Sequence, residues 1–391
     1  MEHWIVTGLG AVILLGYILT TISFMRGNRS IRALSQIPIA GQGEAAAHPN
    51  FPTVSVIIPA RNEARDIEAA LNSVLKLDYP NYELIVLNDR SEDQTGPILD
   101  RLAEIHPTLQ VVHIHSLPHG WLGKNHALWQ GASMANGELL LFTDADVVFE
   151  PSALRRAVQF MQHQSLDHLS AMPGLLCRSL ELSLFMGAFS LFFCMYSRPW
   201  NAKDPKRKDF IGIGAFNLIK KSVYDAVGTH QSIALRPDDD MKLGKRVKLE
   251  GFRQDLCDGS EYIQVEWYHS LPEMIDGLMK NAFAGLNYSV PYALGAVFAQ
   301  LLYSVWPVFA LFFTTGITGW IYASILVLMQ IFCLDHLIKY RLNRWSGLFF
   351  PLSTLLVVYI ILRATALTLM NDGIRWRGTH YPLAALKANR V

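Results

Sequence analysis

The sequence has few cysteines, and none of them lies in a pattern that is typical of metal binding. The four cysteines, Cys177, Cys194, Cys257 and Cys333, are scattered along 391 residues. Since the sequence contains no Cys-x-x-Cys pair, a zinc site and a disulfide framework are both disfavoured.

The sequence also lacks an excess of charge of either sign. Its 34 basic residues nearly balance its 33 acidic residues. The basic residues form no stripe with interleaved aromatic side chains, which is the usual footprint of a nucleic-acid surface. No nucleic-acid partner is therefore expected.

Charge is missing altogether from a stretch near the start of the chain. Residues 4–25 contain no charged side chain, and about 20 apolar residues suffice to cross a bilayer. A cleaved signal peptide is the alternative reading. Glu2 precedes the stretch and Arg26, Arg29 and Arg32 follow it. This order favours an uncleaved transmembrane anchor over residues 1–30 whose following segment is cytoplasmic.

A second long stretch without charge lies near the end of the chain. Residues 281–334 contain no Asp, Glu, Lys or Arg, which is enough for two spans. We therefore expect two transmembrane helices in residues 286–334. The basic stretch at 336–344 would then be cytoplasmic, in agreement with the anchor.

Two further apolar segments have open interpretations. The segment 346–370 contains Pro351 and Arg363 and either spans the membrane or is re-entrant, and a basic tail, 371–391, follows it. The uncharged segment 182–197 is short for a span. It either lies along the membrane surface or forms a buried core helix.

Residues 51–285 have the composition of an ordinary soluble domain and follow a linker at 31–50. Strand-like runs alternate with helical patterns in this part of the chain. The runs are 54–59, 82–88, 110–115 and 138–143, with helical patterns at 95–105 and 124–135. This alternation predicts an α/β fold with a mostly parallel sheet. Ligands bind such sheets beyond the carboxyl ends of the strands.

Polar residues gather at three of these predicted strand ends. They are PARNE at 59–63, NDRSED at 88–93 and TDAD at 143–146. Each alone could be an ordinary turn. Together they predict one binding site, because parallel strands end at the same edge of a sheet. Asp144 and Asp146 could hold a hard divalent cation, although an isolated Asp-x-Asp is weak support.

Five motifs in order, PARNE, NDRSEDQT, GWLGKNHAL, TDADV and RPDDDMKLGKRVKLEGFR, resemble those of family 2 glycosyltransferases. The resemblance implies a GT-A (Rossmann-like) catalytic domain over residues 51–285. It also implies inverting transfer of a sugar from a nucleoside diphosphate donor, with UDP-sugar favoured. A divalent metal, Mg²⁺ or Mn²⁺, is the cofactor that the resemblance implies.

The resemblance assigns expected roles to individual residues. Asp89 would accept an N–H of the base, Lys124 would lie near the donor, Asp144 would face the ribose or the metal, and Asp146 would bind the metal. Four residues, Pro59, Ala60, Arg61 and Glu63, would line the nucleotide pocket.

The same resemblance makes Asp240 the catalytic base that deprotonates the acceptor, with Asp239 beside it in place of the family's Glu. The alternative is that both aspartates only favour a helix N-terminus. Gly214, in the stretch 210–228, resembles the acceptor side of the site. An ordinary glycine-rich strand is the alternative there.

The family's Gln-x-x-Arg-Trp signature is absent. The corresponding residues read GLMKN at 277–281, so Lys280 stands where the Arg would be. Lys280 could still contact the diphosphate or the acceptor, but without the planar fork of Arg. The missing signature disfavours processive polysaccharide synthesis. The layout is similar to lipid-directed members, the ceramide glucosyltransferases and the glycosyltransferases of hopanoid and carotenoid pathways.

The sequence thus predicts a membrane-bound glycosyltransferase with a lipid acceptor, in a bacterial inner membrane with its catalytic domain in the cytoplasm. A polysaccharide synthase and a non-catalytic membrane scaffold that keeps the fold remain as alternatives. A transporter is disfavoured, because the two clearest predicted spans carry no charged residue.

Overall fold

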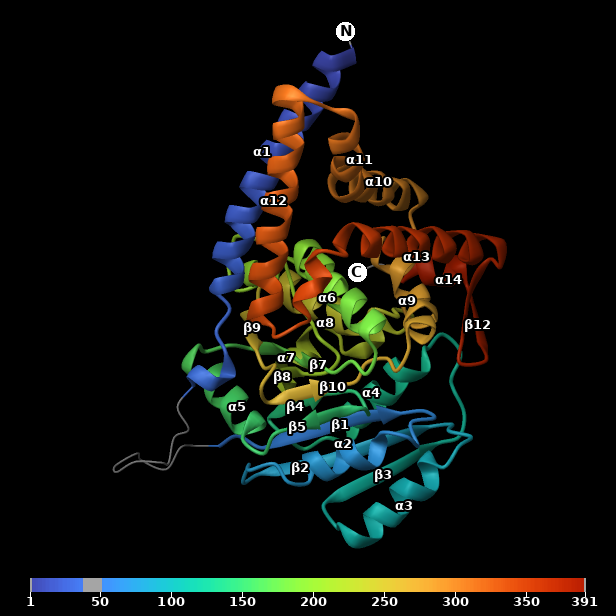
Figure 1. The fold of residues 1–391 in the computed structure, drawn as a ribbon. Coiled ribbons are helices and arrows are strands. Elements are labelled where there is room, and N and C mark those ends of the chain that lie inside the picture. Colours follow the sequence, from blue (N-terminus) through green and yellow to red (C-terminus); the bar gives the residue numbers. More distant parts are fainter. Residues whose placement is uncertain (1, 38–50, 390–391) are drawn as a thin grey trace, which may run out of the picture. The chain divides into compact units, whose positions relative to one another are not determined.

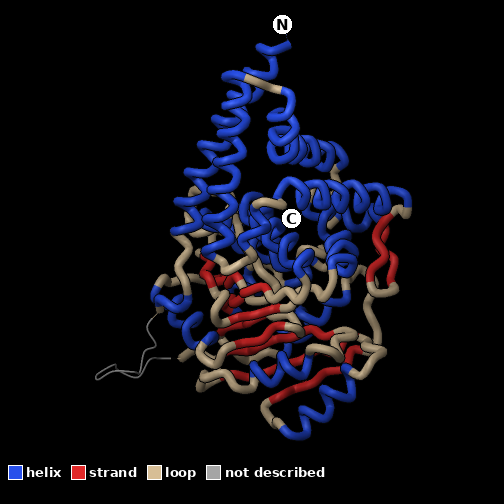
Figure 2. The backbone as a smooth tube through the Cα atoms, viewed as in Figure 1, coloured by secondary structure: helices blue, strands red, loops and turns tan. Residues whose placement is uncertain are grey.

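The computed structural model describes residues 2–37 and 51–389, so most of the predicted linker lies outside it. The chain forms two compact units. We call residues 31–176 and 199–267, with the last residues from 388, the α/β unit, and residues 1–30, 177–198 and 268–387 the helical unit. Figure 2 shows that the α/β unit combines strands with helices, whereas the helical unit is almost entirely helical.

The α/β unit is built on a seven-stranded sheet with the order β3-β2-β1-β4-β8-β6-β9. Only β8 runs antiparallel to its neighbours. The mostly parallel α/β fold class predicted from the sequence is therefore confirmed. The strands are β1 Val54–Ala60, β2 Tyr82–Asp89, β3 Leu109–Ile114, β4 Leu139–Phe142, β6 His168–Met172, β8 Asn217–Lys220 and β9 Gln254–Asp258.

Helices cover the sheet because its central strands are apolar on both faces. In β1, Val56, Ile57 and Ile58 are almost fully buried. Gly131 of α4 (Gly123–Met134) allows that helix to approach closely, since an added Cβ would lie 2.6 Å from the Ile57 side chain. The other helices of the unit are α2 Ile67–Val74, α3 Thr95–Ile105, α5 Ala153–His163, α7 Lys221–Ala226 and α8 Asp239–Leu249.

A small second sheet, in the order β5-β10-β7, belongs to the same unit. Its strands are β5 Val147–Phe149, β7 Gly174–Leu175 and β10 Ile263–Val265. The short 3₁₀ helix η3, His230–Ile233, lies between α7 and α8 along the chain. Its position matters for the site described below, because η3 contacts both α4 and α8.

The helical unit contains the apolar helices and one β-hairpin. Its helices are α1 Glu2–Arg29, α6 Leu180–Ser197, α9 Leu271–Gly285, α10 Val290–Gln300, α11 Trp306–Phe313, α12 Gly316–Lys339, α13 Phe350–Met370 and α14 Leu383–Ala388, with a π-helical turn at Leu301–Val305. The hairpin joins β11 Gly373–Trp376 to β12 Thr379–Pro382.

Within the helical unit, α1 and α12 lie side by side and run in the same direction (Figure 1). Near their starts, the hydroxyl oxygens of Thr7 and Thr318 are 2.6 Å apart. Near their ends, Arg29 donates to Asp335 at 2.7 Å. The basic ends of these two helices therefore lie on the same side of the unit.

Five helices of the described chain are long and apolar enough to cross a membrane. They are 4–29, 180–201, 290–313, 316–339 and 350–370. The two residues that could interrupt the last one do not: Pro351 lies in the first turn of α13, and Arg363 pairs with Asp276 of α9 at 2.9 Å. The segment around 182–197 forms one of the five, α6.

Candidate active site

The loops that follow β1 and β2 are joined by hydrogen bonds. The backbone N–H of Asn62 donates to the hydroxyl of Ser91 at 3.0 Å, and the Asn62 side chain accepts from the N–H of Glu92 at 2.8 Å. The N–H of Glu63 donates to Thr95 at 2.8 Å. These bonds hold the predicted nucleotide residues from Pro59 to Glu63 beside the end of β2.

Asp89, at the end of β2, is buried in an ion-pair cluster. Arg90 donates to both of its carboxylate oxygens, at 2.7 and 3.0 Å. Arg61 approaches to 3.9 Å. Only 1% of Asp89 is exposed. The carboxylate predicted to accept a base N–H is therefore already bonded to a guanidinium on both oxygens, so a base would also meet Arg90 there.

Gly123, the first residue of α4, packs against this pair. A Cβ at position 123 would overlap Asp89 Oδ2 and lie 2.8 Å from the Arg90 guanidinium. The Gly of the GK pair in the motif thus allows the N-terminus of α4 to reach Asp89. A helix N-terminus favours a nearby negative charge.

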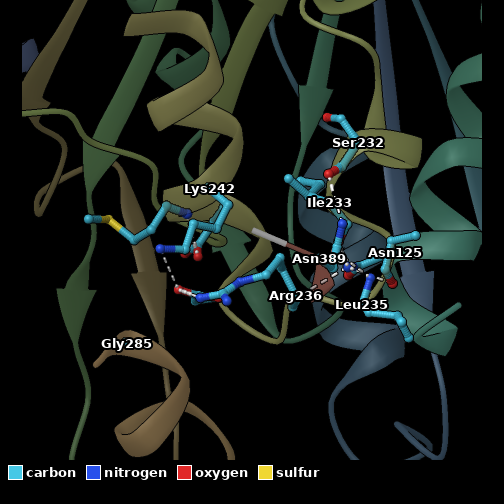
Figure 3. Close-up of polar contacts among 12 residues, drawn as sticks. Asn125, Ser232, Ile233, Leu235, Arg236, Lys242, Gly285 and Asn389 are labelled. Atoms are coloured by element: carbon cyan, nitrogen blue, oxygen red, sulfur yellow. Dashed lines mark hydrogen bonds and ion pairs between the residues drawn. The ribbon is translucent and has the colours of Figure 1, made fainter. Parts of the chain in front are cut away.

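Asn125 fixes the start of α4 to the loop that precedes α8 (Figure 3). Its side-chain amide donates to the backbone oxygens of Ile233 at 2.8 Å and Arg236 at 2.9 Å. From the other end of the chain, Asn389 accepts from the N–H of Leu235 at 3.0 Å. These contacts fix the position of Lys124 relative to the aspartates at the start of α8.

Lys124 is the cation of the predicted site. Its Nζ lies 2.7 Å from Asp144 and 3.7 Å from Asp239. Burial alone lowers the pKa of Lys124, but Asp144, Asp239 and Asp240 outweigh that effect and raise the pKa above its usual value. Lys124 is therefore a permanent positive charge among carboxylates.

Asp240 lies at the first turn of α8 and accepts two backbone hydrogen bonds. The N–H of Gly214 donates to one carboxylate oxygen at 2.8 Å, and the N–H of Met241 donates to the other at 2.7 Å. Burial and the charge of Asp239 raise the pKa of Asp240 to about 7, while Lys124 acts in the opposite direction. A carboxylate with a pKa near neutrality is suited to accept a proton.

Two glycines permit this arrangement. A Cβ on Gly214 would lie 2.6 Å from Asp144, and a Cβ on Gly212 would overlap the backbone oxygen of Asp240. The stretch before β8 thus packs closely against the Asp144 carboxylate and the backbone of Asp240. Residues 210–216 are not a strand, since β8 begins at Asn217.

Asp146 completes the Asp-x-Asp motif between β4 and β5. Burial, Asp144 and Glu63 raise its pKa to about 8. Burial is the largest cause of this shift, and the negative charges of Asp144 and Glu63 add to it, while Lys124 acts in the opposite direction. This is the electrostatic setting in which a divalent cation binds well.

The donor set fits a divalent ion that shares its coordination with a substrate. Among the described residues, no group of three or more His, Cys, Asp or Glu side chains forms a closed metal site. Mg²⁺ usually takes only one or two carboxylates and completes its shell with water and phosphate oxygens. Asp146 and Asp144 supply oxygen ligands of that kind.

Most of the predicted site residues lie in the α/β unit, but Lys280 does not. Lys280 belongs to α9 of the helical unit, where its ammonium lies 3.2 Å from the ring centroid of Trp376. Such cation–π contacts stabilise a desolvated ammonium. The roles of Lys280 and of the other residues remain predictions.

Sequence reasoning missed two residues that organise the site. Asn125 gave no signal, because its three acceptors are backbone oxygens more than 100 residues away. Asp238 could not be told from its two neighbours. It accepts from Arg236 at 2.9 Å and lies 3.4 Å from Lys242, so it supports α8 rather than the pocket.

Comparisons with known proteins agree with this geometry. Residues 55–228 match the sequence model of glycosyl transferase family 2. The chain is 22% identical over 341 residues to a 4,4'-diaponeurosporenoate glycosyltransferase of Staphylococcus aureus, covering 86% of this chain and 90% of that protein. A mannosyltransferase of Pyrobaculum calidifontis, solved in complex with GDP-Man and Mn²⁺, shares the fold. It has a TM-score of 0.54 and 19% identity, and covers 94% of this chain and 99% of its own.

Proposed function

Because residues 55–228 place this chain in glycosyl transferase family 2, we propose that it transfers a sugar, with inversion, from a nucleoside diphosphate donor to a membrane lipid. The observation that carries the proposal is the position of Asp240. Its carboxylate is bonded to the N–H of Gly214, and Gly214 in turn contacts Asp144, which pairs with Lys124. Asp240, Lys124 and Asp144 line the same pocket, which supports a shared role for them in the transfer.

Asp240 would act as the general base. With its pKa near 7, the carboxylate is largely ionised above neutral pH and can take the proton of an acceptor hydroxyl as the oxygen attacks the anomeric carbon. The two backbone N–H donors hold its orientation. Attack on the face opposite the diphosphate inverts the configuration.

Lys124 would stabilise the charge that develops on the departing diphosphate. It is permanently charged, and its pairing with Asp144 and Asp239 keeps it inside the pocket. A cation that is positioned before the reaction stabilises the transition state without further reorganisation. A divalent ion such as Mg²⁺ or Mn²⁺, held by Asp146 with Asp144, would neutralise the diphosphate oxygens when bound. The Mn²⁺ of the mannosyltransferase with the same fold is consistent with this.

The helical unit and one relative support the proposed acceptor class. Five apolar helices suit a substrate that resides in the bilayer. The diaponeurosporenoate of the Staphylococcus aureus relative is a carotenoid acid, whereas the sequence resemblance predicts a lipid hydroxyl. The two acceptor chemistries differ in their need for a base.

The substitution Asp240→Asn distinguishes a lipid hydroxyl acceptor from a carotenoid acid acceptor. A hydroxyl needs a base, so we expect a loss of about 10²–10⁴-fold in transfer to a lipid alcohol. A carboxylic acid is already ionised at neutral pH, with a pKa near 4, so transfer to a carotenoid acid should be far less affected. The measurement is glycolipid formation by mass spectrometry, with membranes given a panel of nucleotide sugars and each acceptor.

Controls make the outcome decisive. Donor binding by Asp240→Asn, followed by calorimetry, should be retained. Asp225→Asn, an exposed aspartate on α7, serves as the matched variant and should transfer normally. Unchanged transfer to a lipid alcohol in Asp240→Asn would remove the assigned base. A long polysaccharide product from the wild type would support the synthase alternative, and donor binding without any turnover would support the scaffold.

The location proposed for the enzyme is a bacterial inner membrane with the α/β unit in the cytoplasm. α1 and α12 run parallel, and both end in basic residues, Arg26 and Arg29 in one and His336 and Lys339 in the other. Positive charge concentrated at one end of two parallel spans is the usual mark of the cytoplasmic side.

A further inference from the structure

A small hollow lies among the predicted catalytic residues. It has a volume of about 10 Å³, roughly the space of one water molecule. Asp144, Asp239 and Asp240 line it together with Lys124, Asn217 and His230, and Leu128 and Phe142 add apolar lining. Residues that can accept hydrogen bonds and residues that can donate them thus line one hollow.

His230 contributes a ring whose orientation is fixed. Only 1% of His230 is exposed. Its ring packs edge-on against Phe142, with centroids 4.9 Å apart. The hydroxyl of Tyr224 lies 2.8 Å from Nδ1. The imidazole therefore has little freedom to turn.

The hydrogen bonds of Tyr224 determine which ring nitrogen carries the proton. The Tyr224 oxygen accepts from the backbone N–H of His230 at 3.1 Å and also bonds to the Thr229 side chain. Its own proton is then directed to Nδ1, because that nitrogen is the remaining partner. In a neutral imidazole with Nδ1 as acceptor, Nε2 carries the hydrogen.

The ring stays neutral under ordinary conditions. Burial and the nearby charge of Lys124 lower the pKa of His230 to about 3. Asn217 has a comparable fixed orientation, since its side-chain oxygen bonds to Nε2 of the buried His168. The amide nitrogen of Asn217 is then its donor end. Two neutral donors and one ammonium thus belong to residues that line the same hollow as three aspartates.

We propose that His230 is a positioning residue, whose Nε2–H holds one ordered water in this hollow, and that this water donates to the carboxylates above it and fixes their orientation. A water that accepts two bonds and donates two satisfies both sides of the lining. The predicted effect on kcat rests on the proposed function, whereas the presence of the water does not.

The test uses the full-length protein in detergent and three variants. His230→Phe keeps a planar ring but removes the donor. His230→Gln restores an N–H near the position of Nε2. Leu154→Ala, which removes buried volume from α5 outside the hollow, controls for general loss of stability.

We expect His230→Phe to lower kcat by about 10- to 100-fold, as a small misplacement of reacting groups can do, with little change in KM for the donor. His230→Gln should recover most of that loss, and Leu154→Ala should lower the Tm without lowering kcat. A high-resolution structure should show one water bonded to His230 Nε2 in the wild type and none in His230→Phe.

Three outcomes would overturn the proposal: a dry hollow in the wild type, an unchanged kcat in His230→Phe, or an equal loss of kcat in Leu154→Ala. A wild type that transfers no sugar to any acceptor would instead refute the proposed function. In that case the high-resolution structures of wild type and His230→Phe still show whether the water is present.

Discussion

Three consecutive aspartates, Asp238, Asp239 and Asp240, have three different environments. Asp238 pairs with Arg236 and Lys242, Asp239 approaches Lys124, and Asp240 accepts backbone N–H groups. Adjacent residues at a helix start point in different directions, so identical side chains acquire different tasks. The sequence motif alone does not distinguish them.

Asp238→Asn should therefore destabilise the fold. Arg236 and Lys242 are 2% and 4% exposed, so the variant leaves two buried cations without their carboxylate. Breaking a buried pair in this way costs about 3 kcal/mol. Chemical denaturation measures the free energy of unfolding, with Asp225→Asn as the exposed control. A free energy of unfolding equal to that of Asp225→Asn would show that the ion pairs of Asp238 do not contribute to stability.

Asp146→Asn should stabilise the metal-free protein, and more so at high pH. An unfolded Asp titrates near pH 3.9, whereas the folded carboxyl titrates at about 8. Between these values the folded state keeps a proton that the unfolded state has lost, so wild-type stability falls as the pH rises. The amide cannot ionise and escapes this penalty.

The measurement is the Tm of wild type and Asp146→Asn in EDTA at pH 5 and pH 9. We expect an advantage of several degrees for the variant at the higher pH and a smaller one at the lower pH. A variant that melts below the wild type at pH 9 would contradict the electrostatic account of this position.

The residues at the strand ends were accessible to sequence reasoning because carboxylates and amides are conspicuous after apolar strands. Pro59 to Glu63, Asp89, Asp144 and Asp146 are all found at such ends. Asn125 and His230 were not accessible, because their partners are determined by tertiary packing. Neither residue type nor local spacing records that an amide will meet a loop 108 positions away.

At the scale of elements, α8 owes its position to glycine. A Cβ on Gly244, within α8, would overlap the backbone oxygen of Ile211. The helix thus lies directly on the backbone of the segment that leads to Gly214. This contact places Asp240 within reach of the Gly214 N–H.

Gly244→Ala should consequently destabilise the fold, whereas a glycine-to-alanine change within a helix usually stabilises it. Alanine inside a helix normally stabilises by about 0.5–1 kcal/mol relative to glycine. Here overpacking costs about 1–3 kcal/mol, and displacement of α8 should also reduce transfer. Gly285→Ala in α9, where a Cβ meets nothing within 4 Å, is the matched control. A stabilised, fully active Gly244→Ala would refute the contact.

The elements themselves were largely predictable within the α/β unit. The helix predicted over 95–105 is α3 with the same bounds, and the strand at 54–59 is β1 with one more residue. The antiparallel β8 was less accessible, because a four-residue strand after a glycine-rich loop carries little periodicity. The order of the strands in the sheet depends on contacts between distant residues, so local sequence patterns did not predict it.

At the scale of the whole molecule, the arrangement of basic helix ends predicts the topology. Thr315 lies in the short turn between α11 and α12, at the opposite end of α12 from Lys339. In a background with the four cysteines replaced by alanine, Thr315→Cys should react with a membrane-impermeant maleimide in intact cells. Arg32→Cys should react only after permeabilisation.

The two single-cysteine variants control for each other, since both positions are exposed. Labelling of Arg32→Cys in intact cells, with Thr315→Cys protected, would reverse the proposed orientation. Labelling of both only after permeabilisation would place Thr315, before α12, and Arg32, after α1, on the same side of the membrane. Because the ends of α1 and α12 are joined by the Arg29–Asp335 pair, that result would contradict a span by α12.

The position of α6 in the chain has a consequence for synthesis. α6 is encoded between β7 and β8, and β8 lies in the sheet between β4 and β6. As the nascent polypeptide leaves the ribosome, β1 to β4 can pair early, but the strand that joins them to β6 emerges only after an apolar helix has appeared. Completion of the seven-stranded sheet therefore waits until this hydrophobic segment has been synthesised.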